Sequence, residues 1–211
     1  MLLLVPALLA LLLARARGGS PRALADLLLR VRGTGFLLAA LAVQIALYLP
    51  ALRISERAVH AGGALYVASL GLAAVGALRN WGLGLAARVA ILGLALNATV
   101  IVANDGHMPV SAAAMRAVRG VGTVREIATE RLFNNTHLAS ASTRLGVLSD
   151  VIPVRIAGVG NVYSVGDVLL ASGLAILLYR ASWPPRRRDA QQRDDQAPVT
   201  VTSARARHVI Q

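Results

Sequence analysis

Five long stretches of this sequence contain no charged side chain and consist mostly of Leu, Ala, Val, Gly and Ile. They cover residues 2–14, 35–52, 61–78, 89–103 and 168–179. A helix needs about 20 residues to cross a bilayer core of about 30 Å. The second and third reach this length with their flanks, and the fourth does so if it starts near residue 84 and Arg88 extends to the interface. We therefore predict an all-α integral membrane protein of about five transmembrane helices, at residues 2–14, 35–52, 61–78, 84–103 and 166–180.

The composition supports a membrane protein over a soluble domain. Apolar residues make up 56% of the chain and charged residues only 15%, whereas soluble domains carry about 25% charged residues. The net charge of +12 comes from arginine alone, and the arginines are not interleaved with aromatic residues as in nucleic-acid-binding proteins. We expect membrane lipids as partners and no nucleic acid. The absence of cysteine excludes disulfides and thiol catalysis.

The arginines predict how the chain is oriented. Residues 15–32 hold five arginines and one aspartate, and four more arginines lie at 180 and 186–188. Connections rich in arginine stay in the cytoplasm. Because Arg15 and Arg17 follow the first apolar stretch, that stretch is predicted to be an anchor with its N-terminus outside, and not a secretory signal. The membrane domain then covers residues 1–183, with an outer segment at 104–165 and a disordered cytoplasmic tail at 184–211.

The two predicted faces also carry amphipathic pieces. On the cytoplasmic side, Ser20 and Pro21 mark the start of a helix that lies on the membrane surface or leads into the second span. In the outer segment, Ser111 can cap one short amphipathic helix, while Thr123 and Glu126 form a capping-box pattern for another. Neither outer piece is apolar enough to span, so the outer segment is predicted to be ordered and to contain short amphipathic helices.

Asp167 stands near the start of the last apolar stretch. If Arg180 marks the cytoplasmic interface, the thirteen residues back to Asp167 rise about 20 Å at about 1.5 Å per residue. Its carboxylate then lies in the outer third of the bilayer core, where charged groups are costly and usually functional. The alternative is that the helix begins at this point and Asp167 caps it at the interface. The sequence leaves both interpretations open.

A second carboxylate, Asp150, lies seventeen residues before Asp167. Pro153 and the glycines at 158, 160 and 166 prevent one continuous helix between them, so the chain can turn and bring the two acids together. Two carboxylates in a site of low dielectric do not both ionise easily, and such a pair can activate a water. This arrangement suits peptide-bond hydrolysis, but paired acids also bind ions or cap helices.

Three motifs carry a resemblance to a known group of proteins. The stretches "NDGHMPVS", "DVIPV" and "GNVYSVGD" are similar to those of an uncharacterised family of bacterial multi-pass membrane proteins, over Leu92 to Tyr179 and more loosely over the connection after the first span. That resemblance implies a fold and a location in the bacterial inner membrane. It implies no reaction.

A weaker likeness concerns lipoprotein signal peptidase, an intramembrane aspartyl peptidase. The stretches "LGVLSDVI" and "SVGD" resemble its two aspartate motifs, which implies catalytic roles for Asp150 and Asp167. Asn104 and Gly106 echo its upstream asparagine motif. Ser164 stands where that family has asparagine, with Asn161 three residues earlier, and no counterpart of its GNLxDR box precedes Asp150.

Two functions remain in view from the sequence. The first is a hydrolase or peptidase that uses Asp150 and Asp167 on a lipid-embedded or lipid-anchored protein substrate, with Arg144 as an interface anchor or a partner of Asp150. The second is a non-catalytic membrane protein that binds lipid or a partner chain, with both aspartates in structural roles. The outer residues Asp105, His107 and His137, together with the two acids, match no recognised metal spacing. We predict no metal site and no cofactor.

Overall fold

The computed structural model describes residues 5–47, 49, 56–129, 135–156 and 159–183. Its helices, in chain order, are α1 (Val5–Ala16), α2 (Pro21–Arg30), α3 (Thr34–Leu47), α5 (Glu56–Leu78), η2 (Trp81–Leu83), α6 (Leu85–Ala103), α7 (Ala112–Thr129), η3 (Gly146–Leu148) and α8 (Val165–Ala181). Four short strands lie between α6 and α8: β1 (Met108–Val110), β2 (Thr136–Leu138), β3 (Ile152–Ile156) and β4 (Val159–Tyr163). The predicted tail at 184–211 lies outside the described residues.

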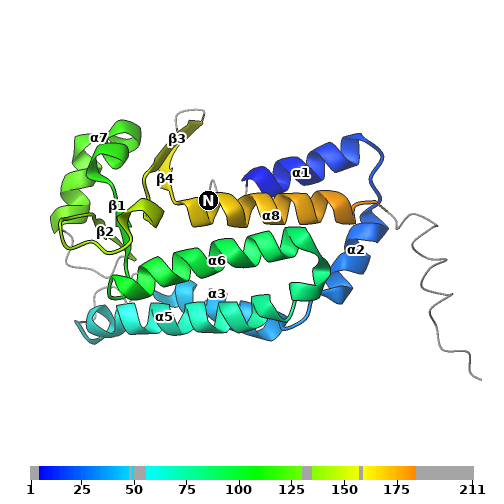
Figure 1. Cartoon of the computed structure of the whole chain (residues 1–211), viewed down its shortest axis with the longest axis horizontal. Helices are drawn as coiled ribbons and strands as arrows, with labels where there is room; N and C mark the ends of the chain where they lie inside the picture. Colours follow the sequence, from blue (N-terminus) through cyan, green and yellow to red (C-terminus); the bar gives the residue numbers. More distant parts are fainter. Residues whose placement is uncertain (1–4, 48, 50–55, 130–134, 157–158, 184–211) are drawn as a thin grey trace, which may run out of the picture.

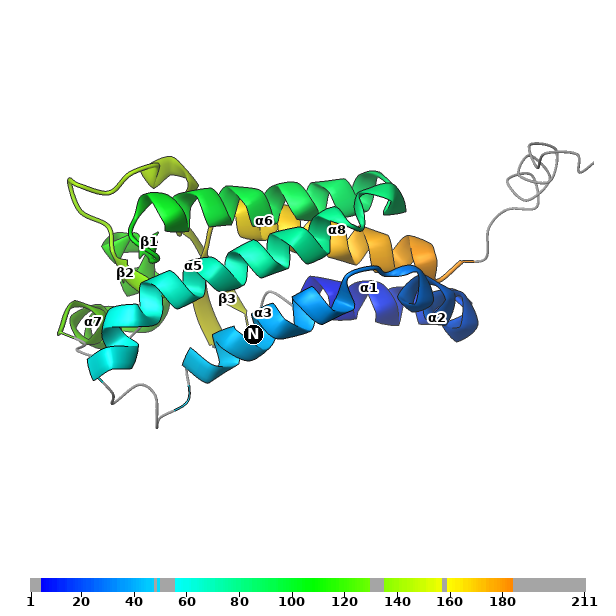
Figure 2. The same cartoon turned by 90° about the horizontal axis from the view of Figure 1, so that it is seen from below.

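Five helices, α1, α3, α5, α6 and α8, lie side by side along the length of the molecule, and successive members of this set run in opposite directions (Figures 1 and 2). Helix α8 packs against both α1 and α6, while α5 packs against α3 and α6. Ala61–Leu78 and Leu85–Ala103 are long and apolar enough to cross a membrane, and α2 with α3 would make a third crossing bent by 89°. Two or three helices therefore fit a membrane protein, and the count of five spans stays a prediction.

Small residues let α6 and α8 approach closely. A Cβ atom on Gly173 of α8 would lie 2.5 Å from the backbone nitrogen of Ala90, and one on Gly93 of α6 would lie 2.5 Å from the backbone nitrogen of Leu170. Ala86 and Ala90 of α6 are buried at the same contact. Such small-residue stripes are how membrane helices gain packing contacts when lipid is as apolar as their side chains.

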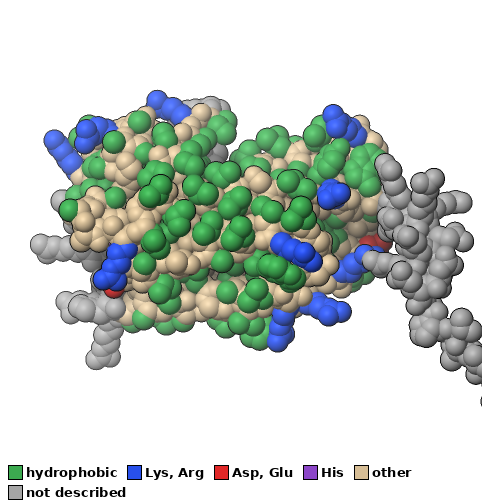
Figure 3. All heavy atoms as spheres, viewed as in Figure 1, with side chains coloured by type: hydrophobic (Ala, Val, Ile, Leu, Met, Phe, Trp, Pro, Cys, Tyr) green, Lys and Arg blue, Asp and Glu red, His purple; other side chains and the backbone are tan. Residues whose placement is uncertain are grey.

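The two ends of the helix bundle differ. At one end lie α2, η2 and the C-terminus of α8, and at the other lie α7 and all four strands (Figure 1). The end with α2, η2 and the C-terminus of α8 carries the arginines that the sequence predicts to be cytoplasmic. Within the described chain these are Arg15, Arg17, Arg22, Arg30, Arg32, Arg79, Arg88 and Arg180. Figure 3 shows a band of apolar side chains between the two ends. Which of the two ends faces the cytoplasm stays a prediction.

The strand end requires a correction to the predicted outer segment. It contains strands as well as helix: β1 pairs with β2 in parallel, β3 pairs with β4 in antiparallel, and Val110 forms a bridge with Asp150. The residues after Asp150 are rich in β-branched side chains, which favour an extended backbone. Pro153 therefore lies within a strand, opposite Val162, and the chain reverses between Asp150 and Asp167 as an antiparallel pair of strands.

The two short outer helices that the sequence predicts lie within α7 as two helical pieces. Ser111 caps the first piece as expected, because the backbone nitrogen of Ala114 donates to its hydroxyl at 3.3 Å. The two pieces meet at Gly120, where a φ of +84° and a ψ of 177° interrupt the helix. The second piece follows this break directly and contains Thr123, so it begins slightly before the predicted capping box. At the other end of the molecule, Ser20 and Pro21 begin α2 as predicted, although the Ser20 side chain makes no capping bond.

The β3–β4 hairpin presents different faces to its two neighbours. Val162 is buried against Val118 of α7, and a Cβ on Gly160 would lie 2.5 Å from the Val118 carbonyl. On the opposite face, Val154 and Tyr163 line a cavity beside α8. The hairpin thus links the outer helix α7 to the start of the last helix.

Candidate functional site

Asp167 lies in the first turn of α8 and closes a capping box with Ser164. The backbone nitrogen of Asp167 donates to the Ser164 hydroxyl at 2.9 Å, and the backbone nitrogen of Ser164 donates to Asp167 Oδ2 at 3.2 Å. Each residue thus satisfies a backbone donor that the start of a helix leaves free. This geometry bears out the interpretation of Asp167 as a helix-start residue.

Asn97 of α6 completes the site, and sequence reasoning did not single it out. Its Nδ2 donates to Asp167 Oδ1 at 2.7 Å, and its Oδ1 accepts from the Ser164 hydroxyl at 2.8 Å. Gly166 is required between these groups because a Cβ there would collide with Asn97 Oδ1. The available signal was an amide side chain in an otherwise apolar span, since polar groups in such spans seek partners on neighbouring helices.

Asp150 is fixed by its main chain and not by its carboxyl group. Its backbone nitrogen donates to the Pro109 carbonyl, and its own carbonyl accepts from the Ser111 nitrogen, both at 2.9 Å. Its Oδ1 is buried and has no hydrogen-bond partner in the described part of the chain. Burial, and next the negative charge of Asp167, raise the pKa of the Asp150 carboxyl to about 7.

The structure therefore brings Asp150 and Asp167 within electrostatic reach of each other. Among the residues that the structure describes, no hydrogen bond joins the two carboxyl groups. Asp167 uses both oxygens for Asn97 and Ser164, whereas Asp150 keeps an unused oxygen. The two acids therefore lie in different environments.

The other predicted support residues hold the loop structure at the strand end. Asn104 Oδ1 accepts from the backbone nitrogen of Arg144 at 3.0 Å, and its Nδ2 donates to the Arg144 carbonyl at 3.0 Å. Gly106 adopts a φ of +85° just after α6, and a Cβ there would lie 2.6 Å from the Cα of Gly63. Asn104 and Arg144 thus meet through the main chain of Arg144, and Gly106 permits α5 to pack closely.

An open cavity of about 310 Å³ lies beside Asp167, between α1, β3 and α8. Its lining is mostly apolar and consists of Val5, Pro6, Leu9, Val154, Ile156, Tyr163, Asp167, Val168, Ala171 and Ser172. We call it the outer groove. Asn161 lies opposite Val154 in the hairpin register but does not line the groove. Burial raises the pKa of the Tyr163 phenol.

The histidines at the strand end form a pair and not a metal centre. The rings of His107 and His137 lie 5.5 Å apart between centroids. Burial, and then the nearby His107, lower the pKa of His137. Within the described ranges, no three His, Asp or Glu side chains are grouped so that they could hold a metal ion.

The described chain is thus mostly helical, and two or three of its helices fit a membrane protein. Asn97, Ser164 and Asp167 form a hydrogen-bonded cluster near the end that holds the strands. The chain belongs to a family of unknown function, DUF5317, whose sequence profile matches residues 28–179. The expected membership of an uncharacterised family is therefore confirmed. Comparison with curated proteins and with solved structures gave no match.

Proposed function

We propose that this protein is a non-catalytic membrane protein that binds an acyl chain of a membrane lipid in the outer groove. The observation that carries the proposal is the groove itself, which is apolar and open and lies beside helices with exposed apolar side chains. Leu8 and Leu9 of α1 are 57% and 58% exposed, and Val168 of α8 is 47% exposed. Apolar surface of this extent on a membrane protein contacts lipid.

The hydrogen bonding of Asp167 supports binding over catalysis. Both of its oxygens already accept hydrogen bonds, one from Asn97 and one from the Ser164 backbone. These bonds give the carboxylate a structural role at the start of α8, which needs no catalysis. Asp167 therefore contributes a polar group to the lining of the groove, and it also links α8 to α6.

A photoreactive lipid tests this proposal. The full chain, reconstituted in phosphatidylcholine vesicles that contain a lipid with a diazirine on its acyl chain, should crosslink at groove residues such as Val154 and Val168. Ser172→Trp places a large side chain in the groove and should lower crosslinking several-fold. Ile176→Trp, one turn further along α8 and outside the groove, should not. Equal crosslinking in both variants would remove support for an occupied groove.

Hydrolysis of a lipid-anchored protein substrate is a second candidate function, and the state of Asp150 favours it. A carboxyl with a pKa near neutrality and an unused oxygen, close to a second acid, is a candidate proton donor. The likeness of the two aspartate stretches to lipoprotein signal peptidase points the same way. In this mechanism Asp150 would protonate the leaving amine, and Asp167 would accept a proton from the attacking water after releasing Asn97.

Separate asparagine substitutions test the catalytic candidate. If the pair is catalytic, Asp150→Asn and Asp167→Asn should each abolish lipoprotein processing in bacterial cells that depend on this protein, while the protein still accumulates. Asp105→Asn, an exposed acid at the same end, is the matched control. Normal processing in both site variants would exclude hydrolysis and leave the lipid-binding proposal untouched.

A further inference from the structure

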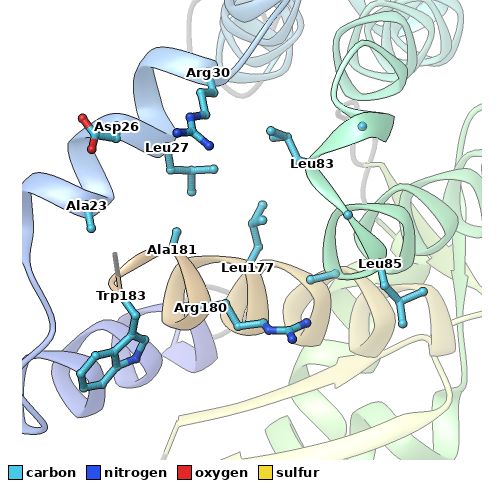
Figure 4. Close-up of a pocket in the computed structure, with 13 residues that line it drawn as sticks. Ala23, Asp26, Leu27, Arg30, Leu83, Leu85, Leu177, Arg180, Ala181 and Trp183 are labelled. Atoms are coloured by element: carbon cyan, nitrogen blue, oxygen red, sulfur yellow. The ribbon is translucent and has the colours of Figure 1, made fainter. Parts of the chain in front are cut away.

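A second cavity, of about 360 Å³, lies at the arginine-rich end, between α2, η2 and the C-terminus of α8. We call it the inner pocket. In Figure 4, Leu27, Leu83 and Leu177 point toward one another at its centre, while Arg30 of α2 and Arg180 of α8 lie at its rim. The pocket thus combines an apolar floor with two guanidinium groups.

The charges of the inner pocket are not balanced within the described chain. Asp26 is the only carboxylate among its lining residues, and its side chain points away from the centre (Figure 4). No ion pair joins Arg30 or Arg180 to an acid among the residues that the structure describes. Guanidinium groups bind phosphate through paired N–H donors, so Arg30 and Arg180, which both line the pocket, each suit contact with a phosphate group.

Hydrogen bonds to the main chain connect the segments around the inner pocket. The backbone nitrogen of Ser20, just before α2, donates to the Ser182 carbonyl at 2.7 Å. The side chain of Asn80, just before η2, binds both the backbone nitrogen and the carbonyl of Arg32 at 2.8 Å each. A cavity with walls fixed in this way is already formed before a ligand enters.

Two surfaces beside the pocket indicate a lipid and not a soluble phosphate. Leu28 and Leu29 of α2 are 61% and 85% exposed, so the apolar side of this helix lies open to acyl chains. Trp183, a residue type that is enriched where proteins meet lipid headgroups, also lines the pocket. From this geometry we infer that the inner pocket binds the phosphate headgroup of an anionic phospholipid, with its acyl chains along α2.

Lipid retention by the full-length protein tests this inference. Native mass spectrometry in a neutral detergent compares phosphatidylglycerol with phosphatidylcholine of the same acyl chains. The unaltered chain should retain phosphatidylglycerol preferentially, and the double variant Arg30→Gln/Arg180→Gln should lose about tenfold or more of that affinity, because it lacks two charge-assisted contacts. Arg15→Gln/Arg22→Gln removes the same charge from exposed positions of the same end outside the pocket and should keep the preference.

A third variant separates pocket shape from charge. Leu83→Trp fills the pocket while both rim arginines remain, and it should also reduce phosphatidylglycerol retention. Equal loss in the two double variants, or full retention in Leu83→Trp, would overturn the inference. Displacement of the lipid by an excess of inorganic phosphate would reassign the pocket to a soluble phosphate and would also overturn it. None of these outcomes depends on the outer groove.

Discussion

Asn97 is the residue that makes the Asp167 site a contact between helices as well as a cap. It donates to Asp167 and accepts from Ser164, so one amide satisfies two polar groups of another helix. Within an apolar surrounding, a carboxylate that loses a partner is left with an uncompensated lone pair, which is costly. The stability of the α6–α8 contact should therefore depend on this side chain.

Asn97→Ala should lower the free energy of unfolding by about 1–3 kcal/mol, because it leaves Asp167 Oδ1 and the Ser164 hydroxyl without their partner. Thermal unfolding in detergent measures the change. Thr99→Val is the control, since the Thr99 hydroxyl bonds only to the Ala95 carbonyl of its own helix. A similar unfolding temperature for both variants would contradict the structural role of Asn97.

Asp150 makes the stability of the protein depend on pH. Its pKa is about 7 in the folded chain against an ordinary value of 3.8, so the folded state holds a proton that the unfolded state releases. Stability from this group is greatest near pH 4, falls as the pH rises toward 7, and is level above that. Each unit of pKa difference corresponds to about 1.4 kcal/mol.

Asp150→Asn should therefore flatten the stability profile between pH 5 and about 8, and the variant should be the more stable chain at the alkaline end. Thermal unfolding of both chains across this range provides the measurement. Asp105→Asn, which removes an exposed acid at the same end, should follow the unaltered chain. An identical slope for the chains with and without the Asp150 carboxyl would contradict its burial.

Sequence reasoning recovered part of the site at this scale. The distance from Arg180 predicted Asp167 within the bilayer core, and a helix start was the open alternative. The structure has Asp167 in the first turn of α8, three residues after the N-cap Ser164. Asn97 was missed because it lies 70 residues from Asp167 and no local pattern links them. The contact depends on how α6 and α8 pack, which a single sequence does not encode locally.

At the scale of elements, the close approach of α6 and α8 depends on residues without side chains. Gly173→Leu should lower the free energy of unfolding by about 3 kcal/mol or more, because the new side chain would meet the Ala90 backbone. Gly71→Leu, in α5, is the matched control, since a Cβ there meets nothing within 4 Å. Folded yield after purification and unfolding temperature report the effect. Equal tolerance of both changes would mean that α6 and α8 are not in tight contact.

The elements themselves were predicted unevenly. The apolar stretches gave the positions of the long helices because their signal extends over many residues. Helix α3 covers Thr34–Leu47, and its predicted end at residue 52 lies outside the described residues. The sequence does not predict the strands, because Pro153 and the nearby glycines favour turns. Their pairing is set by partners outside the segment, such as the contact between Val110 and Asp150, and not by a local period.

At the scale of the whole molecule, the alternating helices and the two unlike ends predict an accessibility pattern. The chain has no native cysteine, so single cysteines report cleanly. In intact bacterial cells, a membrane-impermeant maleimide should label Ser142→Cys at the strand end but not Ala25→Cys in α2. Permeabilised cells should show labelling of both. Labelling of Ala25→Cys in intact cells, without Ser142→Cys, would invert the proposed orientation.

The position of α8 has a consequence for how the protein is made. This helix comes last in the described chain, yet it packs between α1 and α6. Until residues 164–181 have been synthesised, Asn97 lacks its hydrogen-bond partners Ser164 and Asp167. The packing of the earlier helices is therefore incomplete until α8 is made, because α8 contacts both α1 and α6. A chain truncated before residue 164 would leave the Asn97 side-chain amide without these partners, which should make it a target of quality-control proteases.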